Sequence, residues 1–87
     1  MAKYTIEFAP SSARSFKKLS RDLQGRLGKA IDKLAINPLP SGVKILSGVD
    51  NLFRVRVGDY RIVYQMKSSE LIVLVVRLGH RRDIYER

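Results

Sequence analysis

The sequence predicts an α+β domain in which two N-terminal helices pack on one face of a small, mostly antiparallel sheet. Three observations support this fold class: an alternating segment opens the chain, two segments with helical spacing follow, and strand-like segments separated by turn signals come last. The expected element order is therefore β-α-α-β-β-β. With 87 residues, 45% of them hydrophobic, the chain is expected to form one domain, residues 1–87, around a single modest core.

The first strand and the first helix are predicted from residues 3–19. Residues 3–8 alternate polar and apolar side chains, which is typical of a strand with one buried face. Ala9-Pro10 ends this strand, and Ser11 or Ser12 is the expected cap of a short helix. Ala13, Phe16 and Leu19 then recur at helical spacing.

A longer amphipathic helix is predicted to follow, with Ser20 as its cap. Gly25 and Gly28 lower its intrinsic propensity and suggest close packing onto the first helix. Residues 37–42 end it as a loop, and residues 43–46 form too short a segment to assign. The apolar positions of this helix follow i, i+4, i+7, i+8 and i+11 spacing: Leu23, Leu27, Ala30, Ile31 and Leu34.

Residues 52–66 predict a β-hairpin with two different faces. Gly58-Asp59 is a two-residue turn with glycine first, the type II′ pattern, so Arg56 is expected opposite Arg61. Side chains alternate along a strand. The apolar face, expected in the core, carries Phe53, Val55, Val57, Tyr60, Ile62, Tyr64 and Met66. The other face, called the arginine face below, carries Arg54, Arg56, Arg61, Val63 and Gln65.

The arginine face suggests a polyanionic partner. Like charges that face each other across two strands are destabilising, so this arrangement indicates a function. The net charge of +9 also favours nucleic acid, an anionic membrane or an acidic protein as the partner. Arginine offers a planar, two-pronged donor that matches phosphate.

The last strand and the segment after it complete the predicted site. Residues 71–78 are almost continuously apolar, as in a central strand covered on both faces. Residues 79–85 follow as Gly-His-Arg-Arg-Asp-Ile-Tyr. If this segment lies beside Arg61, the arginine face gains His80, Tyr85 and either Arg81 or Arg82.

Such a set of side chains suits RNA cleavage. Attack of a 2′-hydroxyl on the adjacent phosphate needs a base, donors for the charge that grows on the phosphate oxygens, and an acid for the departing 5′-oxygen. Arginine suits the donor role and is a poor base, because it hardly ever loses its proton. Nearby guanidinium groups would lower the pKa of a tyrosine and favour its phenolate.

Composition excludes other kinds of site. The chain has no cysteine, one histidine and scattered carboxylates, so neither a disulfide framework nor a metal cluster is expected, and no cofactor is predicted. The longest apolar run, residues 71–76, is far too short to span a bilayer, and no signal-type segment is present. A soluble cytoplasmic protein that does not bind membranes is expected.

The motif in residues 52–65 and the Gly-His-Arg-Arg-Asp-Ile-Tyr segment strongly resemble the RelE toxins of the RelE/ParE superfamily. The element order also matches, so the resemblance covers essentially the whole chain. It implies a RelE-like, microbial-RNase-like fold and the toxin of a type II toxin–antitoxin system. It also implies an endoribonuclease that enters the ribosomal A site and cuts translated mRNA by 2′-hydroxyl attack.

The resemblance assigns roles by position. Arg61 matches the arginine that stabilises the phosphate, Arg81 the proposed acid or charge stabiliser, and Tyr85 the proposed general base. Arg54 and Arg56 stand where the best-known relatives have lysine; they keep the electrostatic role, but a proton-transfer role becomes doubtful. Together with Arg82 and His80, they are expected to bind RNA or phosphate.

The implied partners are an acidic RelB-like antitoxin, in a hetero-oligomeric complex, and the ribosome with its mRNA. Two alternatives remain: a ParE-like toxin, which shares the fold but acts on DNA gyrase without catalytic residues, and a plain nucleic-acid-binding module. The positions of several residues can also be explained without a role in RNA binding. Tyr60 and Tyr64 are expected to pack in the core rather than stack on RNA, and His80 could be a bystander. Arg54 and Arg56 could belong to a solvated strand face.

Overall fold

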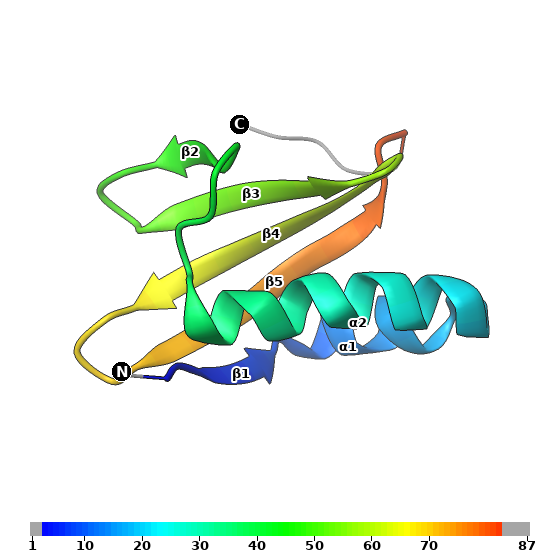
Figure 1. Ribbon diagram of the computed structural model, residues 1–87, viewed down its shortest axis with the longest axis horizontal. Coiled ribbons are helices and arrows are strands. Elements are labelled where there is room, and N and C mark those ends of the chain that lie inside the picture. The colour runs from blue at the N-terminus through cyan, green and yellow to red at the C-terminus, as the bar shows by residue number, and fades with distance from the viewer. Residues whose placement is uncertain (1–2, 83–87) are drawn as a thin grey trace.

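The computed structural model describes residues 3–82 and places two helices on one face of a five-stranded sheet (Figure 1). This arrangement confirms the predicted α+β class and adds one strand, β2, in the segment that was too short to assign. Within the described residues, no helix is long and apolar enough to cross a membrane. The elements are β1 (Thr5–Phe8), α1 (Pro10–Lys17), α2 (Arg21–Ile36), β2 (Lys44–Ser47), β3 (Leu52–Val57), β4 (Tyr60–Lys67) and β5 (Ile72–His80).

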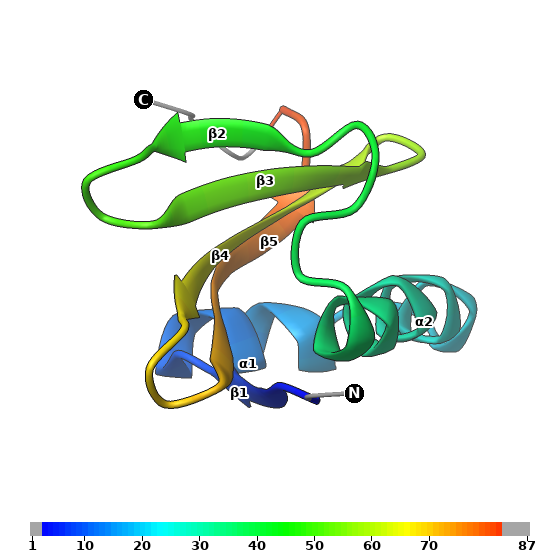
Figure 2. The ribbon, with the colours of Figure 1, turned by 60° about the vertical axis from the view of Figure 1, so that its left-hand side comes forward.

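The sheet has the strand order β1-β5-β4-β3-β2. β1 is parallel to β5, and every other neighbouring pair is antiparallel, as predicted for a mostly antiparallel sheet. β5 is an interior strand, between β1 and β4, but the expectation that both of its faces are covered is wrong. Both helices lie on the same side of the sheet (Figure 2), so Ile72 and Leu74 on the other face are only half-buried.

The two helices begin differently. Ser20 caps α2 as predicted, and its hydroxyl oxygen accepts the Leu23 N–H at 3.3 Å. The expected cap of α1 at Ser11 or Ser12 is wrong, because α1 already begins at Pro10, whose fixed φ and missing N–H suit a first helical position. Ser12 is buried instead, with its hydroxyl 2.8 Å from the Ala9 carbonyl oxygen and 2.6 Å from that of Val75. This side chain therefore ties α1 to β5.

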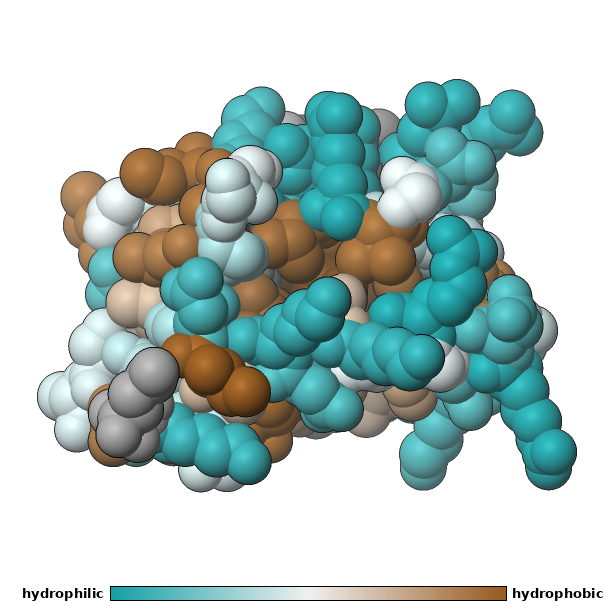
Figure 3. Space-filling model, in the orientation of Figure 1, coloured by the Kyte–Doolittle hydropathy of each residue, from teal (hydrophilic) through white to brown (hydrophobic). Residues whose placement is uncertain are grey.

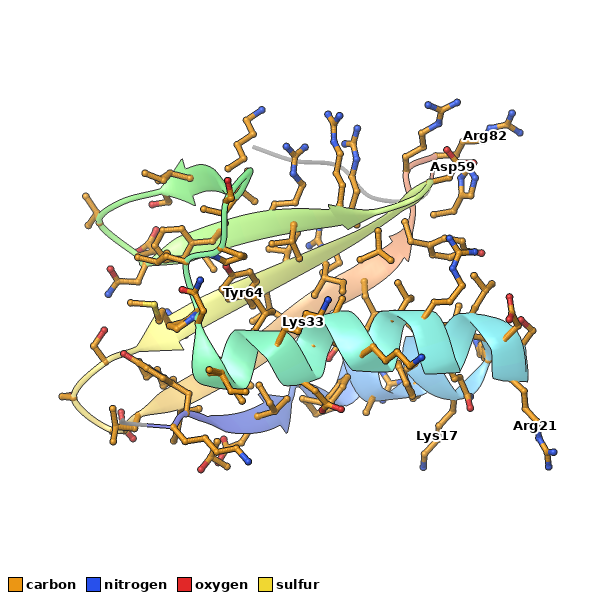
Figure 4. The ribbon with its side chains drawn as sticks, in the orientation of Figure 1. Lys17, Arg21, Lys33, Asp59, Tyr64 and Arg82 are labelled. Atoms are coloured by element: carbon orange, nitrogen blue, oxygen red, sulfur yellow. The ribbon has the colours of Figure 1, made fainter. Side chains whose placement is uncertain are left out.

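The hydrophobic core lies between α2 and the sheet. Tyr64 is fully buried in it, which confirms its predicted core position, and its hydroxyl donates to the Pro38 carbonyl oxygen at 2.6 Å (Figure 4). Burial raises the pKa of Tyr64 from 10.0 to about 12, because the charged phenolate would lose its hydration. The core cluster contains Leu27, Ile31, Leu34, Phe53, Ile62, Tyr64, Val73, Val75 and Leu78.

The two glycines of α2 are not sites of tight packing. A Cβ atom at Gly28 would lie 4.0 Å from Cζ of Phe16, which is an ordinary contact with α1. A Cβ atom at Gly25 would meet nothing within 4 Å. The expectation of a close helix–helix approach is therefore wrong at Gly25. Gly28 faces α1, but the space between them would accommodate a Cβ atom.

Candidate nucleic-acid interface

The hairpin of β3 and β4 has the predicted register. Val57 pairs with Tyr60 and Arg56 with Arg61, so the two arginines face each other across the strands. The turn requires glycine at position 58, where φ is +61°. A Cβ atom there would also come within 3.1 Å of Nη2 of Arg26, so a guanidinium group of α2 lies against this turn.

The three arginines of this face differ in burial. Arg56 is exposed and Arg61 is half-buried. Arg54 retains only 7% of its surface, because Lys44 pairs with it on one side and Val63 on the other. The alternative that Arg54 belongs to a solvated strand face is therefore wrong. A buried guanidinium is held in place by its surroundings, so it can present a fixed positive charge to a ligand.

Side chains that end in nitrogen atoms project from the sheet on the side away from the helices (Figure 4). The space-filling view shows the same upper edge of the molecule, over β3, as mainly hydrophilic (Figure 3). The register adds two cations that sequence reasoning missed: Lys44 opposite Arg54, and Arg77 opposite Val63. Arg77 stands out in the sequence as a charged residue after a run of apolar ones, but the sequence does not show which face of the strand it occupies.

A β-bulge in β5 brings Arg77 to the arginine face. Tyr64 pairs with Val75 and Val63 with Arg77, so Val76 is an extra residue between the two pairs. Without it, strict alternation would put Arg77 on the same face as Val75, inside the core. The bulge reverses the alternation, so that Leu78 enters the core and Arg77 points outward.

The segment after the last strand divides between the two faces. His80 pairs with Tyr60, and their rings meet edge to face with centroids 5.5 Å apart. Paired residues share a face of the sheet, and Tyr60 packs against the core. The expectation that His80 joins the arginine face is therefore wrong. The Nδ1 atom of His80 accepts the backbone N–H of Arg82 at 3.2 Å.

Arg81 and Arg82 are both exposed at the end of the sheet. Arg61 pairs with Gly79, and the backbone N–H of Arg81 donates to the Asp59 carbonyl oxygen at 2.8 Å. This bond continues the ladder between β4 and β5 and fixes the Arg81 backbone beside the hairpin turn. Arg82 and Asp59 lie together at this end of the molecule (Figure 4). Tyr85 lies outside the described residues.

The side chains of this face are suited to stabilising negative charge on a ligand rather than to transferring protons. Guanidinium groups on one open face can donate several hydrogen bonds to a single phosphate. Residues 3–82 contain no group of three His, Cys, Asp or Glu side chains that could hold a metal ion.

The sequence of this chain is similar to those of known toxins. The family model described as "ParE toxin of type II toxin-antitoxin system, parDE" matches residues 3–85. Toxin RelG of Mycobacterium tuberculosis is 32% identical over 85 residues, covering 97% of this chain and 98% of that protein. A putative RelE-like toxin of Escherichia coli is 29% identical and covers 95% and 90% of the two chains.

Solved structures agree on the fold. The toxin–antitoxin complex RelBE2 from Mycobacterium tuberculosis matches with a TM-score of 0.73 and 29% identity, over 91% of this chain and 99% of the other. The archaeal RelE–RelB complex from Pyrococcus horikoshii matches with a TM-score of 0.82 and 24% identity, over 97% and 100% of the two chains.

Proposed function

We propose a nuclease function from one established premise: this chain belongs to the RelE/ParE superfamily of type II toxin–antitoxin toxins. The proposed activity is ribosome-dependent cleavage of translated mRNA in the cytoplasm, which inhibits translation. The observation that carries this proposal is the pairing of Arg56 with Arg61 on an open sheet face, with Arg77 turned toward the same face. A phosphate bound there would be attracted by several guanidinium groups at once, each of which can donate charge-assisted hydrogen bonds to its oxygens.

The proposed reaction forms one bond at phosphorus and breaks another. The 2′-oxygen attacks the adjacent phosphate, the bond to the 5′-oxygen breaks, and a 2′,3′-cyclic phosphate and a 5′-hydroxyl result. Arg61 donates to the non-bridging oxygens, whose charge grows in the transition state. Tyr85 takes the proton of the 2′-hydroxyl. The departing 5′-oxygen takes a proton either from Arg81, or from water while Arg81 stabilises its negative charge.

The remaining cations of the face are proposed to hold the RNA. Arg56 binds a phosphate beside the cleaved one, Arg54 adds its positive charge from a largely buried position on the same face, and Arg82 binds the backbone at the end of the sheet. His80 has no part in this phosphate site, because it lies on the other face of the sheet. The ribosome would supply the alignment of the 2′-hydroxyl with the phosphate, a form of catalysis by positioning.

An acidic, RelB-like antitoxin is the proposed protein partner, in a hetero-oligomeric complex. Support comes from the solved relatives, several of which are complexes of RelE with RelB. The positive face of this chain is complementary to an acidic partner, which would cover the arginine face or displace residues 81–85.

A ParE-like toxin that inhibits DNA gyrase is the second candidate, because the matching family model is the ParE toxin. Primer extension on mRNA from cells that express the chain separates the two functions, with gyrase-linked DNA breaks measured in parallel. The nuclease proposal expects new mRNA ends from the wild type and few or none from Arg61→Ala, Arg81→Ala or Tyr85→Phe. Arg21→Ala, an exposed cation of α2 that points away from the arginine face (Figure 4), is the matched control. DNA breaks without mRNA ends would establish the gyrase alternative.

A further inference from the structure

A cavity of about 380 Å³ lies between α1 and the end of β5, outside the arginine face. Its origin is the short first strand. β1 ends at Phe8, which pairs with Val75, and the chain then turns into α1 at Pro10. Beyond Val75, β5 therefore has no strand on this side, and α1 leaves open space beside residues 77–80.

The walls of the cavity combine an aromatic surface with polar groups. Tyr60 and His80 form the aromatic surface, with their rings edge to face. Leu19 and Leu78 add apolar contacts, and hydroxyl groups come from the serines of α1, among them Ser11 and Ser15. A flat ring with hydrogen-bonding edges is the kind of ligand that such walls accept.

The polar groups retain hydrogen-bonding capacity. The Ser15 hydroxyl donates to the Ser11 carbonyl oxygen at 3.1 Å, which leaves its lone pairs available as acceptors. The Nδ1 atom of His80 accepts the Arg82 N–H, so the neutral imidazole carries its proton on Nε2 and is a donor there. Acceptor and donor thus lie in the walls of one cavity.

Arg77 joins the cavity to the arginine face. It lines the cavity, yet the bulge places it opposite Val63 on the face that also carries Arg61. Because the edge of β5 is open here, a chain of nucleotides can cross it from one face to the other. A phosphate on the arginine face and a base in the cavity would then lie on opposite sides of the same strand.

We infer that this cavity binds one unpaired nucleobase of the RNA whose phosphates lie on the arginine face; this inference rests on the proposed function. Single-stranded RNA is recognised by unstacked bases that stack on aromatic side chains and hydrogen-bond through their edges. The cavity is therefore a specificity site, whereas the arginine face binds the backbone without regard to sequence. His80 contacts the base, and Arg77 guides the backbone across the strand.

The test uses ribosomes programmed with mRNA that carries 2′-O-methyl groups in the A site, which removes the nucleophile and prevents cleavage. Binding of fluorescently labelled toxin is measured by anisotropy with normal mRNA and with mRNA that lacks one A-site base, each base being removed in turn. For one position, the wild type should bind the abasic mRNA on the order of tenfold more weakly, as expected for the loss of one stacked base.

Variants then locate the effect. His80→Ala and Ser15→Ala should bind normal mRNA more weakly and reduce the ratio between the two mRNAs toward one, while His80→Phe, which keeps an aromatic ring, should restore part of it. Ser68→Ala, an exposed serine in the loop after β4, is the control that leaves the ratio unchanged. Urea unfolding establishes that each variant is folded.

Two failures are distinguishable. The base site is refuted if the wild type binds programmed ribosomes but no abasic position changes its affinity. It is also refuted if His80→Ala and Ser15→Ala both keep the wild-type ratio of the two affinities. In both cases the nuclease proposal is unaffected. If the wild type does not bind programmed ribosomes at all, the proposed function fails and this inference fails with it. Arg61→Ala should weaken binding of both mRNAs equally, because it removes a backbone contact alone.

Discussion

Replacing Arg56 with threonine tests whether the arginine face is maintained for function at the expense of stability. Arg56 and Arg61 are a directly paired, like-charged couple on adjacent strands. Cross-strand pairs contribute roughly 0.2–1 kcal/mol, with like charges destabilising. Arg56 is exposed, so water and salt screen the repulsion and place it near the lower limit, about 0.3 kcal/mol at low salt. Threonine removes the charge and is itself a good strand former.

We therefore expect Arg56→Thr to fold at least as stably as the wild type and to lose toxicity. Urea unfolding at two salt concentrations measures the stability gain, which should shrink as salt rises. Lys67→Thr is the control, because it makes the same kind of substitution on β4 opposite an apolar residue, Ile72. Its effect on stability should depend less on salt. A variant that is clearly less stable and still fully toxic in a cell-growth assay would refute the reasoning.

Three further predictions concern stability and association. Gly25→Ala should stabilise the protein by up to about 1 kcal/mol in urea unfolding, because a helical Cβ atom at this position meets nothing within 4 Å. Gly42→Ala should destabilise the protein, because Gly42 is equally uncrowded but has a φ of +85°. Tyr64→Phe should cost about 1 kcal/mol near neutral pH through loss of the bond to Pro38. The unfolded chain loses the phenol proton near pH 10 and the folded protein only near pH 12, so wild-type stability should fall across that window by up to about 1.4 kcal/mol per pH unit. Tyr64→Phe should lack this component, and equal pH slopes for the two proteins would contradict it. Association with an acidic antitoxin should slow markedly as salt rises in stopped-flow measurements, and a salt-independent rate would argue against electrostatic steering.

The hairpin could be predicted closely because its information is local. Gly58-Asp59 fixes the turn, and a two-residue turn fixes which residues pair, so Arg56 opposite Arg61 follows from the sequence alone. The core face followed from strict alternation, which placed Ile62 and Tyr64 inside. The cap of α2 at Ser20 was equally local.

The rest of the site depends on features that leave no alternating pattern. β5 is apolar on both faces, so nothing in its sequence marks Val76 as the bulged residue, and the sides taken by Arg77 and His80 could not be deduced. The burial of Arg54 depends on its pairing with β2, a strand of only four residues that is too short to assign from the sequence. The start of α1 differs from the prediction because Pro10 begins the helix, although two serines that are good cap residues follow it.

The position of β5 between β1 and β4 has a consequence during synthesis. β5 is the last of the five strands to be made, yet it separates β1 from β4 in the sheet. While a ribosome is still translating the region before residue 72, β1 has no strand to pair with, and Arg77 has not been added. The nascent chain can therefore close only its β2–β3–β4 meander, and the parallel pairing that spans the sequence must wait. A polypeptide of this topology therefore acquires its complete cationic surface only after its last strand has been synthesised.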